Sequence, residues 1–177
     1  MRLLVGDIFK SNAQTLINTV NCVAVMGKGI ALEFKNRFPD MYDDYVQRCQ
    51  SGEVKPGVPY LYKTLFLPQI INFPTKDHWK LMSKVSDIEH GLKHLRDYYQ
   101  AWGVTSLAVP VLGCGNGQLE WRVVGPLIYR FVKDMPIPIE MHAPYATHPK
   151  ELTVEFLAQG EDRHTEITVK NGQLADR

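Results

Sequence analysis

The feature that most constrains the fold of this chain is a regular alternation of short apolar strands with helices. Strands are predicted at 3–5, 15–20, 60–62, 69–73, 106–111 and 137–142, and helices at 29–38, 41–50, 86–102 and 121–134. This order is typical of α/β proteins, in which helices connect the strands of one sheet. The sequence therefore predicts the α/β class.

Local signals place the ends of several of these elements. Ser86, followed three residues later by Glu89, forms the pattern of a capping box and predicts that the longest helix starts at Ser86. Pro39 is predicted to stop the first helix. Pro138 predicts an edge or end position in the last strand, because proline has no backbone N–H to donate.

The composition restricts the class of protein further. The chain has 177 residues, a net charge of +1 and 45% hydrophobic residues, as expected of one globular domain without a strongly basic surface. It contains no apolar run near the roughly 20 residues that span a bilayer. Arg2 and Asp7 place charge too early for a signal peptide. We therefore expect a cytoplasmic domain, and we expect a monomer.

The cysteines and histidines do not form a recognisable metal or disulfide pattern. Cys22, Cys49 and Cys114 are odd in number and far apart, which argues against a disulfide framework and a zinc site. The six histidines show no ligand spacing, so we expect no metal. Cys114 lies among glycines, and a nucleophilic thiol there is one alternative, although no residue beside it in the sequence looks like a base.

The last part of the chain differs in character from the rest. Residues 147–177 carry four basic and six acidic side chains, which leaves this segment at about −2 and the preceding part at +3. A short helix is predicted at 151–159, and the remainder is polar. We interpret 147–177 as a polar C-terminal tail or linker and not as a second domain.

Two glycine-rich loops each follow a predicted strand and precede a helix, at 25–30 and 113–117. Glycine allows the backbone to approach a ligand closely, and the free amides at a helix start favour phosphate. Neither loop is a dinucleotide fingerprint or a P-loop, so ordinary turn glycines remain an alternative. Asn18 and Asn21 precede the first loop and suit either ribose hydroxyls or strand-end backbone groups.

Five motifs, in this order along the chain, resemble the macrodomain family and, within it, the DarG-like branch. They are Gly6–Ile8, Asn18–Asn21, Met26–Ala31, Phe73–Lys76 and Pro110–Gly115. The resemblance covers residues 1–145 and implies a three-layer α/β/α fold with a mixed six-stranded sheet that binds ADP-ribose. It predicts a macrodomain at residues 1–146.

The resemblance also implies a set of ADP-ribose contacts. Asp7 and Ile8 would meet the adenine, Asn21 would face the distal ribose, and Tyr145 would flank the adenosine end. The other implied contacts are Thr19, Val20 and Thr75, the first phosphate loop of Lys28, Gly29, Ile30 and Ala31, and the second of Gly113, Cys114, Gly115, Asn116 and Gly117.

Lys76 corresponds to the catalytic lysine of the DarG-like branch, which removes ADP-ribose from thymine bases of DNA. A related branch, which cleaves glutamate-linked ADP-ribose, pairs such a lysine with an aspartate in the second glycine loop. Gly117 stands at that position here. This departure favours the DNA-directed reaction. Lys76 would act either as a nucleophile at C1″ of the distal ribose or as a cation that stabilises the departing base.

The segment after Lys76 combines basic and aromatic residues, which suits contact with single-stranded DNA. The candidate contacts are His78, Trp79, Lys80 and Lys84, and a charged surface loop is the alternative. His78 is also a candidate acid or base.

The resemblance thus implies a DNA ADP-ribosyl glycohydrolase without a cofactor, with a DarT-type toxin as a partner. The alternatives are a protein or small-molecule ADP-ribose hydrolase, an ADP-ribose-1″-phosphate phosphatase and a non-enzymatic ADP-ribose reader.

Overall fold

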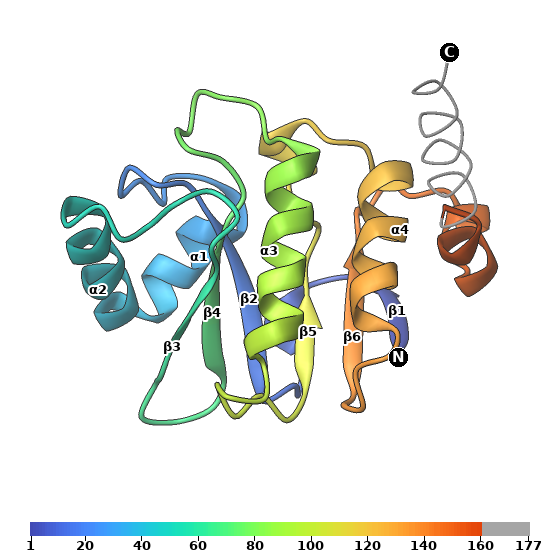
Figure 1. Cartoon of the computed structure of the whole chain (residues 1–177), viewed down its shortest axis with the longest axis horizontal. Coiled ribbons are helices and arrows are strands. Elements are labelled where there is room, and N and C mark those ends of the chain that lie inside the picture. The colour runs from blue at the N-terminus through green and yellow to red at the C-terminus, as the bar shows by residue number, and fades with distance from the viewer. Residues whose placement is uncertain (161–177) are drawn as a thin grey trace, which may run out of the picture.

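The computed structural model describes residues 1–160 and has one six-stranded sheet in the order β1-β6-β5-β2-β4-β3 (Figure 1). All neighbouring strands are parallel except β3, which is antiparallel to β4. The strands are β1 (Arg2–Val5), β2 (Thr15–Val20), β3 (Tyr60–Tyr62), β4 (Gln69–Pro74), β5 (Leu107–Val109) and β6 (Ile139–Ala143). The predicted α/β class and mixed six-stranded sheet are confirmed.

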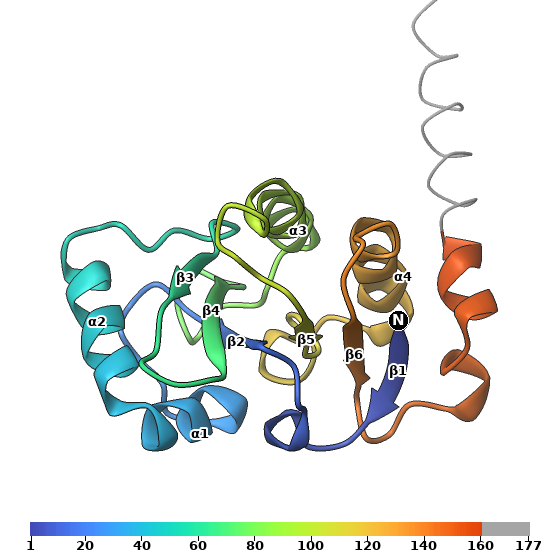
Figure 2. The same cartoon turned by 90° about the horizontal axis from the view of Figure 1, so that it is seen from below.

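Four α-helices cover the two faces of this sheet, which makes three layers (Figure 2). Alternate residues of a strand point to opposite faces, so Ile17 and Ile71 pack with the helices on one face while Leu16 and Ile70 pack on the other. The first face carries α3 (Val85–Tyr98) and α4 (Trp121–Val132), and the second carries α1 (Gly29–Arg37) and α2 (Pro39–Gln50).

Two buried asparagines fix the register of the central strands. Asn18 of β2 and Asn72 of β4 are direct neighbours in the ladder, and the Asn18 side-chain amide donates to the Asn72 side-chain oxygen at 3.0 Å. Both side chains are fully buried, so a slip in register would leave their polar atoms unpaired at a cost of about 1–3 kcal/mol each. This register places the loops that follow β2 and β4 side by side.

The structure corrects two of the local predictions. The predicted capping box at Ser86 is wrong, because α3 begins at Val85 with Lys84 as its N-cap and without a side-chain cap. Pro138 precedes β6, which lies inside the sheet between β1 and β5, so the end position is confirmed and the edge position is wrong. Pro39 separates α1 from α2 as predicted and also supplies the first residue of α2.

The segment predicted as a polar tail starts with residues that pack on α4. Leu157 is fully buried in the cluster that includes the α3 and α4 side chains. The Trp121 indole N–H donates to the Glu151 carbonyl oxygen at 3.2 Å. The described start of the segment therefore lies against the domain. The division after residue 146 stays a prediction, and residues 161–177 lie outside the described part.

None of the helices in the described residues 1–160 is long and apolar enough to cross a membrane.

Candidate active site

Three loops at the carboxyl ends of β2, β4 and β5 enclose a cavity of about 590 Å³. In parallel α/β sheets this edge is where ligands bind, and the volume suits a ligand of cofactor size. Most of the sequence-predicted residues line this cavity. They are Thr19, Val20, Asn21, Lys28, Gly29, Ile30, Ala31, Thr75, Lys76, Trp79, Gly113, Cys114, Gly115, Asn116 and Gly117.

The two glycine loops face each other across the cavity. Gly29 is the first residue of α1 and has a φ of +55°, a conformation that favours glycine. A Cβ atom at Gly29 would lie 3.6 Å from the side-chain nitrogen of Asn116 in the second loop. The first amides of α1 have no partners within the helix, so they are donors suited to an anion at this end of the cavity.

The second glycine loop is shaped by Ser83, which packs behind it. Gly113 has a φ of +72°, and a Cβ atom there would lie 3.0 Å from the Ser83 Cβ. The Ser83 backbone N–H donates to the Gly117 carbonyl oxygen at 3.0 Å. A Cβ atom at Gly117 would collide with the Ser83 hydroxyl. An aspartate at position 117 is therefore incompatible with Ser83 in this position, which gives a steric reason for the departure seen in the sequence.

Lys76 joins the β4 loop to the second glycine loop. Its Nζ donates to the carbonyl oxygen of Asn116 at 2.9 Å and to that of Trp79 at 3.2 Å. The residue is only 9% exposed. Burial lowers the pKa of the Lys76 ammonium below its ordinary value of 10.5. Lys76 is therefore a buried cation at the cavity wall, held by two neutral acceptors, with a third Nζ hydrogen free of these two bonds.

Asn21 lines the cavity, but most of its hydrogen-bonding capacity is used within its own loop. Its side-chain oxygen accepts from the Val23 N–H at 3.0 Å, and its amide nitrogen donates to the Val25 carbonyl oxygen at 2.7 Å. One amide hydrogen remains. A contact with the distal ribose stays a prediction, and it would have to use that hydrogen.

The residues predicted to meet the adenosine end do not line the cavity. Asp7 caps a short 3₁₀ helix at Ile8–Lys10 by accepting from the Phe9 N–H at 2.9 Å. Ile8 is buried in the core on the α1 and α2 face. Tyr145 is largely exposed. These three residues are not among those that line the cavity, and their contact with adenine stays a prediction.

Not all of the candidate DNA-contact residues line the cavity. Trp79 lines the cavity and is half exposed. His78 stacks on its ring with a centroid separation of 5.4 Å, and the Lys80 Nζ lies 5.1 Å from the ring centroid. Lys84 is the N-cap residue of α3 and is not among the residues that line the cavity. The three residues 78–80 form one basic and aromatic group beside Lys76.

The nucleophile alternative at Cys114 finds no electrostatic support. Burial raises the pKa of this thiol to about 11, so it stays protonated at neutral pH. Among the described residues there is no group of three or more histidine, cysteine, aspartate or glutamate side chains that could hold a metal ion.

Val25, Gly27 and Val111 also line the cavity and were not among the predicted contacts. All three belong to segments that the sequence analysis had singled out. The two valines were missed because an apolar residue beside a glycine loop is usually part of the core, and no other pattern marks them as ligand contacts.

The fold and this site define an α/β domain with a cavity between two glycine loops at the carboxyl edge of its sheet. A family model described as "Macro domain" matches residues 17–128, and the chain belongs to the macrodomain family.

Among curated relatives, the chain is 42% identical over 162 residues to a DNA ADP-ribosyl transferase–DNA ADP-ribosyl glycohydrolase fusion protein of Thermosipho africanus. That alignment covers 81% of this chain and 42% of the relative. The chain is also 43% identical over 134 residues to a DNA ADP-ribosyl glycohydrolase of Mycobacterium tuberculosis, an alignment that covers 74% of this chain and 38% of that relative. The chain therefore spans less than half the length of these curated relatives.

Solved structures give the same picture. The Thermosipho africanus DarTG in complex with ADP-ribose superposes with a TM-score of 0.83 at 42% identity, covering 88% of this chain and 45% of that one. The macrodomain of Mycobacterium tuberculosis DarG superposes with a TM-score of 0.78 at 40% identity, covering 81% of this chain and 97% of that one. The predicted resemblance to DarG macrodomains is confirmed.

Proposed function

We propose that this chain is a DNA ADP-ribosyl glycohydrolase that removes ADP-ribose from thymidine bases of single-stranded DNA and so reverses a DarT-type toxin. The observation that carries the proposal is Lys76, a buried lysine with a lowered pKa at the wall of the cavity. The names of the relatives, DNA ADP-ribosyl glycohydrolases at 42–43% identity, support the substrate class.

In this proposal the cavity holds ADP-ribose with its diphosphate between the two glycine loops. The free amides at the start of α1 and the backbone around Gly115 supply donors from opposite sides. This placement brings the distal ribose toward Lys76. The site needs no metal or nucleotide cofactor, because the reacting group comes from the chain itself.

The bond to be broken joins C1″ of the distal ribose to a base nitrogen. As the base leaves, C1″ develops oxocarbenium character, and the Lys76 amine forms a bond to this carbon. Lys76 loses a proton, the departing thymine gains one, and water then releases ADP-ribose from the lysine. Burial lowers the pKa of Lys76 and so raises the fraction of neutral amine that this step requires.

The group at residues 78–80 would receive the DNA strand. The Trp79 ring offers a surface on which a base can stack, and Lys80 beside it can meet a backbone phosphate. Both lie next to Lys76, whose Nζ donates to the Trp79 carbonyl oxygen. The strand would thus enter beside the reacting carbon.

The test is release of ADP-ribose from a thymidine-ADP-ribosylated single-stranded oligonucleotide, followed by chromatography. The proposal expects turnover by the protein without added metal. Tight binding of ADP-ribose with no release would make the chain a non-enzymatic reader.

The toxin partner is tested separately by co-expression with a DarT-type transferase. Rescue of growth is expected from removal of the modification. Rescue that persists in a catalytically inactive variant would instead assign the protection to direct binding of the toxin.

A further inference from the structure

The loop that follows β2 has an unusual backbone. Ala24 has a φ of +61°, in the left-handed region that residues with a Cβ atom rarely adopt. The loop is also a wall of the cavity, through Asn21 and Val25 on either side of Ala24. A strained conformation persists only where its surroundings enforce it, and such conformations gather at ligand sites.

Part of that enforcement comes from the Asn21 side chain. Its oxygen accepts from the backbone of Val23 at 3.0 Å and Val25 at 3.4 Å, so it closes the loop on itself. The closure depends on where the Asn21 side chain is held.

The rest of the enforcement comes from one face of α2. Residues 42 and 45 are three positions apart, which places them on the same side of the helix. The Tyr45 hydroxyl lies 2.9 Å from both the carbonyl oxygen and the side-chain oxygen of Asn21. The Tyr42 hydroxyl donates to the Ala24 carbonyl oxygen at 3.2 Å.

Tyr45 is suited to a fixed structural contact. It is fully buried, and burial raises the pKa of its hydroxyl well above the ordinary value, so the hydroxyl keeps its proton and donates. Tyr45 does not line the cavity and cannot touch a ligand there. Any effect on the ligand must pass through Asn21.

We infer that Tyr45, assisted by Tyr42, is a positioning residue that holds the 21–25 loop in its ligand-binding shape before the ligand arrives. Without the Tyr45 hydroxyl, Ala24 is free to relax to an ordinary conformation, and the cavity wall must be rebuilt on binding. A binding-competent state that is only partly populated weakens the apparent affinity by that fraction. The inference rests on the proposed function in taking ADP-ribose as the ligand.

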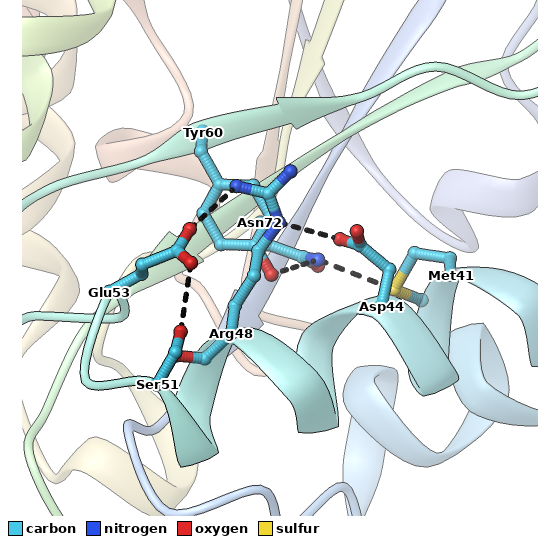
Figure 3. Close-up of polar contacts among 7 residues, drawn as sticks. All are labelled: Met41, Asp44, Arg48, Ser51, Glu53, Tyr60 and Asn72. Atoms are coloured by element: carbon cyan, nitrogen blue, oxygen red, sulfur yellow. Dashed lines mark hydrogen bonds and ion pairs between the residues drawn. The ribbon is translucent and has the colours of Figure 1, made fainter.

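The test compares Tyr45→Phe with Tyr60→Phe as a matched control. Tyr60 is partly buried, and its hydroxyl accepts one hydrogen bond from Asn72, at 3.1 Å, within the polar group that joins α2 to β3 and β4 (Figure 3). It makes no contact with the 21–25 loop among the hydrogen bonds of the described residues. Each variant loses one hydrogen-bonded hydroxyl, so thermal unfolding of both measures the general cost of that loss.

The readout is ADP-ribose binding by calorimetry together with KM and kcat on the modified oligonucleotide. For Tyr45→Phe we expect the Kd and KM to rise by about 5- to 10-fold, the equivalent of one lost hydrogen bond, with kcat nearly unchanged. For Tyr60→Phe the Kd should stay at the wild-type value. Tyr42 is less buried than Tyr45, so Tyr42→Phe should raise the Kd by a smaller factor. It replaces Tyr45→Phe in the test if that variant does not fold.

A second variant separates positioning from general damage. Glycine adopts a positive φ without the penalty that alanine carries, so Ala24→Gly in the Tyr45→Phe background should recover much of the affinity. Equal Kd values for wild type and Tyr45→Phe, or no recovery in the double variant, would overturn the inference. If the wild type itself does not bind ADP-ribose, the proposed function fails instead, so the two failures are distinct.

Discussion

Replacing Lys76 by methionine should abolish the reaction while leaving the fold intact. Methionine keeps the apolar stem of lysine and removes only the ammonium, which now donates to the carbonyl oxygens of Asn116 and Trp79. Loss of a group that acts directly on the transition state costs about 10²- to 10³-fold in kcat, or roughly 3–4 kcal/mol. A group that also forms the covalent bond should cost at least the upper value.

The effect of Lys76→Met on stability should be small, because two contributions oppose each other. The folded-state pKa of Lys76 lies below its ordinary value of 10.5, so the unfolded chain binds this proton more tightly than the folded chain. At neutral pH the buried charge therefore opposes folding, and stability rises as pH rises through the lowered pKa. Removing the ammonium relieves this penalty but leaves two carbonyl oxygens without their donor, at about 1 kcal/mol each.

The assay is single-turnover release of ADP-ribose from a thymidine-ADP-ribosylated oligonucleotide, with thermal unfolding measured on the same samples. Lys28→Met is the comparison, because Lys28 also lines the cavity but is exposed and lies in the first glycine loop. It should raise KM more than it lowers kcat. Near wild-type single-turnover rates for Lys76→Met would refute the assignment of Lys76 as the reacting group.

Three further changes test other parts of the account. The kcat/KM should rise with pH and level off at a pKa below 10.5, since a neutral Lys76 amine is required; a fall with rising pH would assign Lys76 to charge stabilisation instead. Trp79→Ala should raise KM for the modified oligonucleotide about 5-fold or more, as expected of a lost stacking surface, with the Kd for free ADP-ribose changed less; equal changes in both would argue against base stacking. Leu157→Ala should destabilise the domain by about 2–5 kcal/mol in denaturant unfolding, because Leu157 is fully buried; a change under 0.5 kcal/mol would show that this segment does not stabilise the domain.

Most of the sheet was predictable because its strands are short apolar runs that end at glycine, proline or polar residues. The two glycine loops were predictable because each lies between a predicted strand and a predicted helix. The importance of Lys76 was not predictable from spacing or composition. A lone lysine in a polar stretch resembles a surface residue, and only the family resemblance singled it out.

The features that the sequence analysis missed depend on contacts between distant segments. α3 begins at Val85, just after the hydrogen bond from the Ser83 N–H to the Gly117 carbonyl oxygen, which joins this part of the chain to the second glycine loop. The packing of Leu157 was missed because Leu152, Val154, Phe156 and Leu157 form only a short apolar stretch, and nothing in their spacing shows that they pack on α4. The Asn21 side-chain oxygen accepts a hydrogen bond from Tyr45, 24 positions away in the chain, and no local sequence pattern predicts that contact.

The choice of substrate is the most direct test of the central claim. The protein is incubated in parallel with thymidine-ADP-ribosylated single-stranded DNA and with glutamate-ADP-ribosylated protein, and free ADP-ribose is measured in each. The account predicts release from the DNA alone, because position 117 carries a glycine packed against Ser83 and no aspartate. Release from the protein substrate with none from the DNA would contradict it.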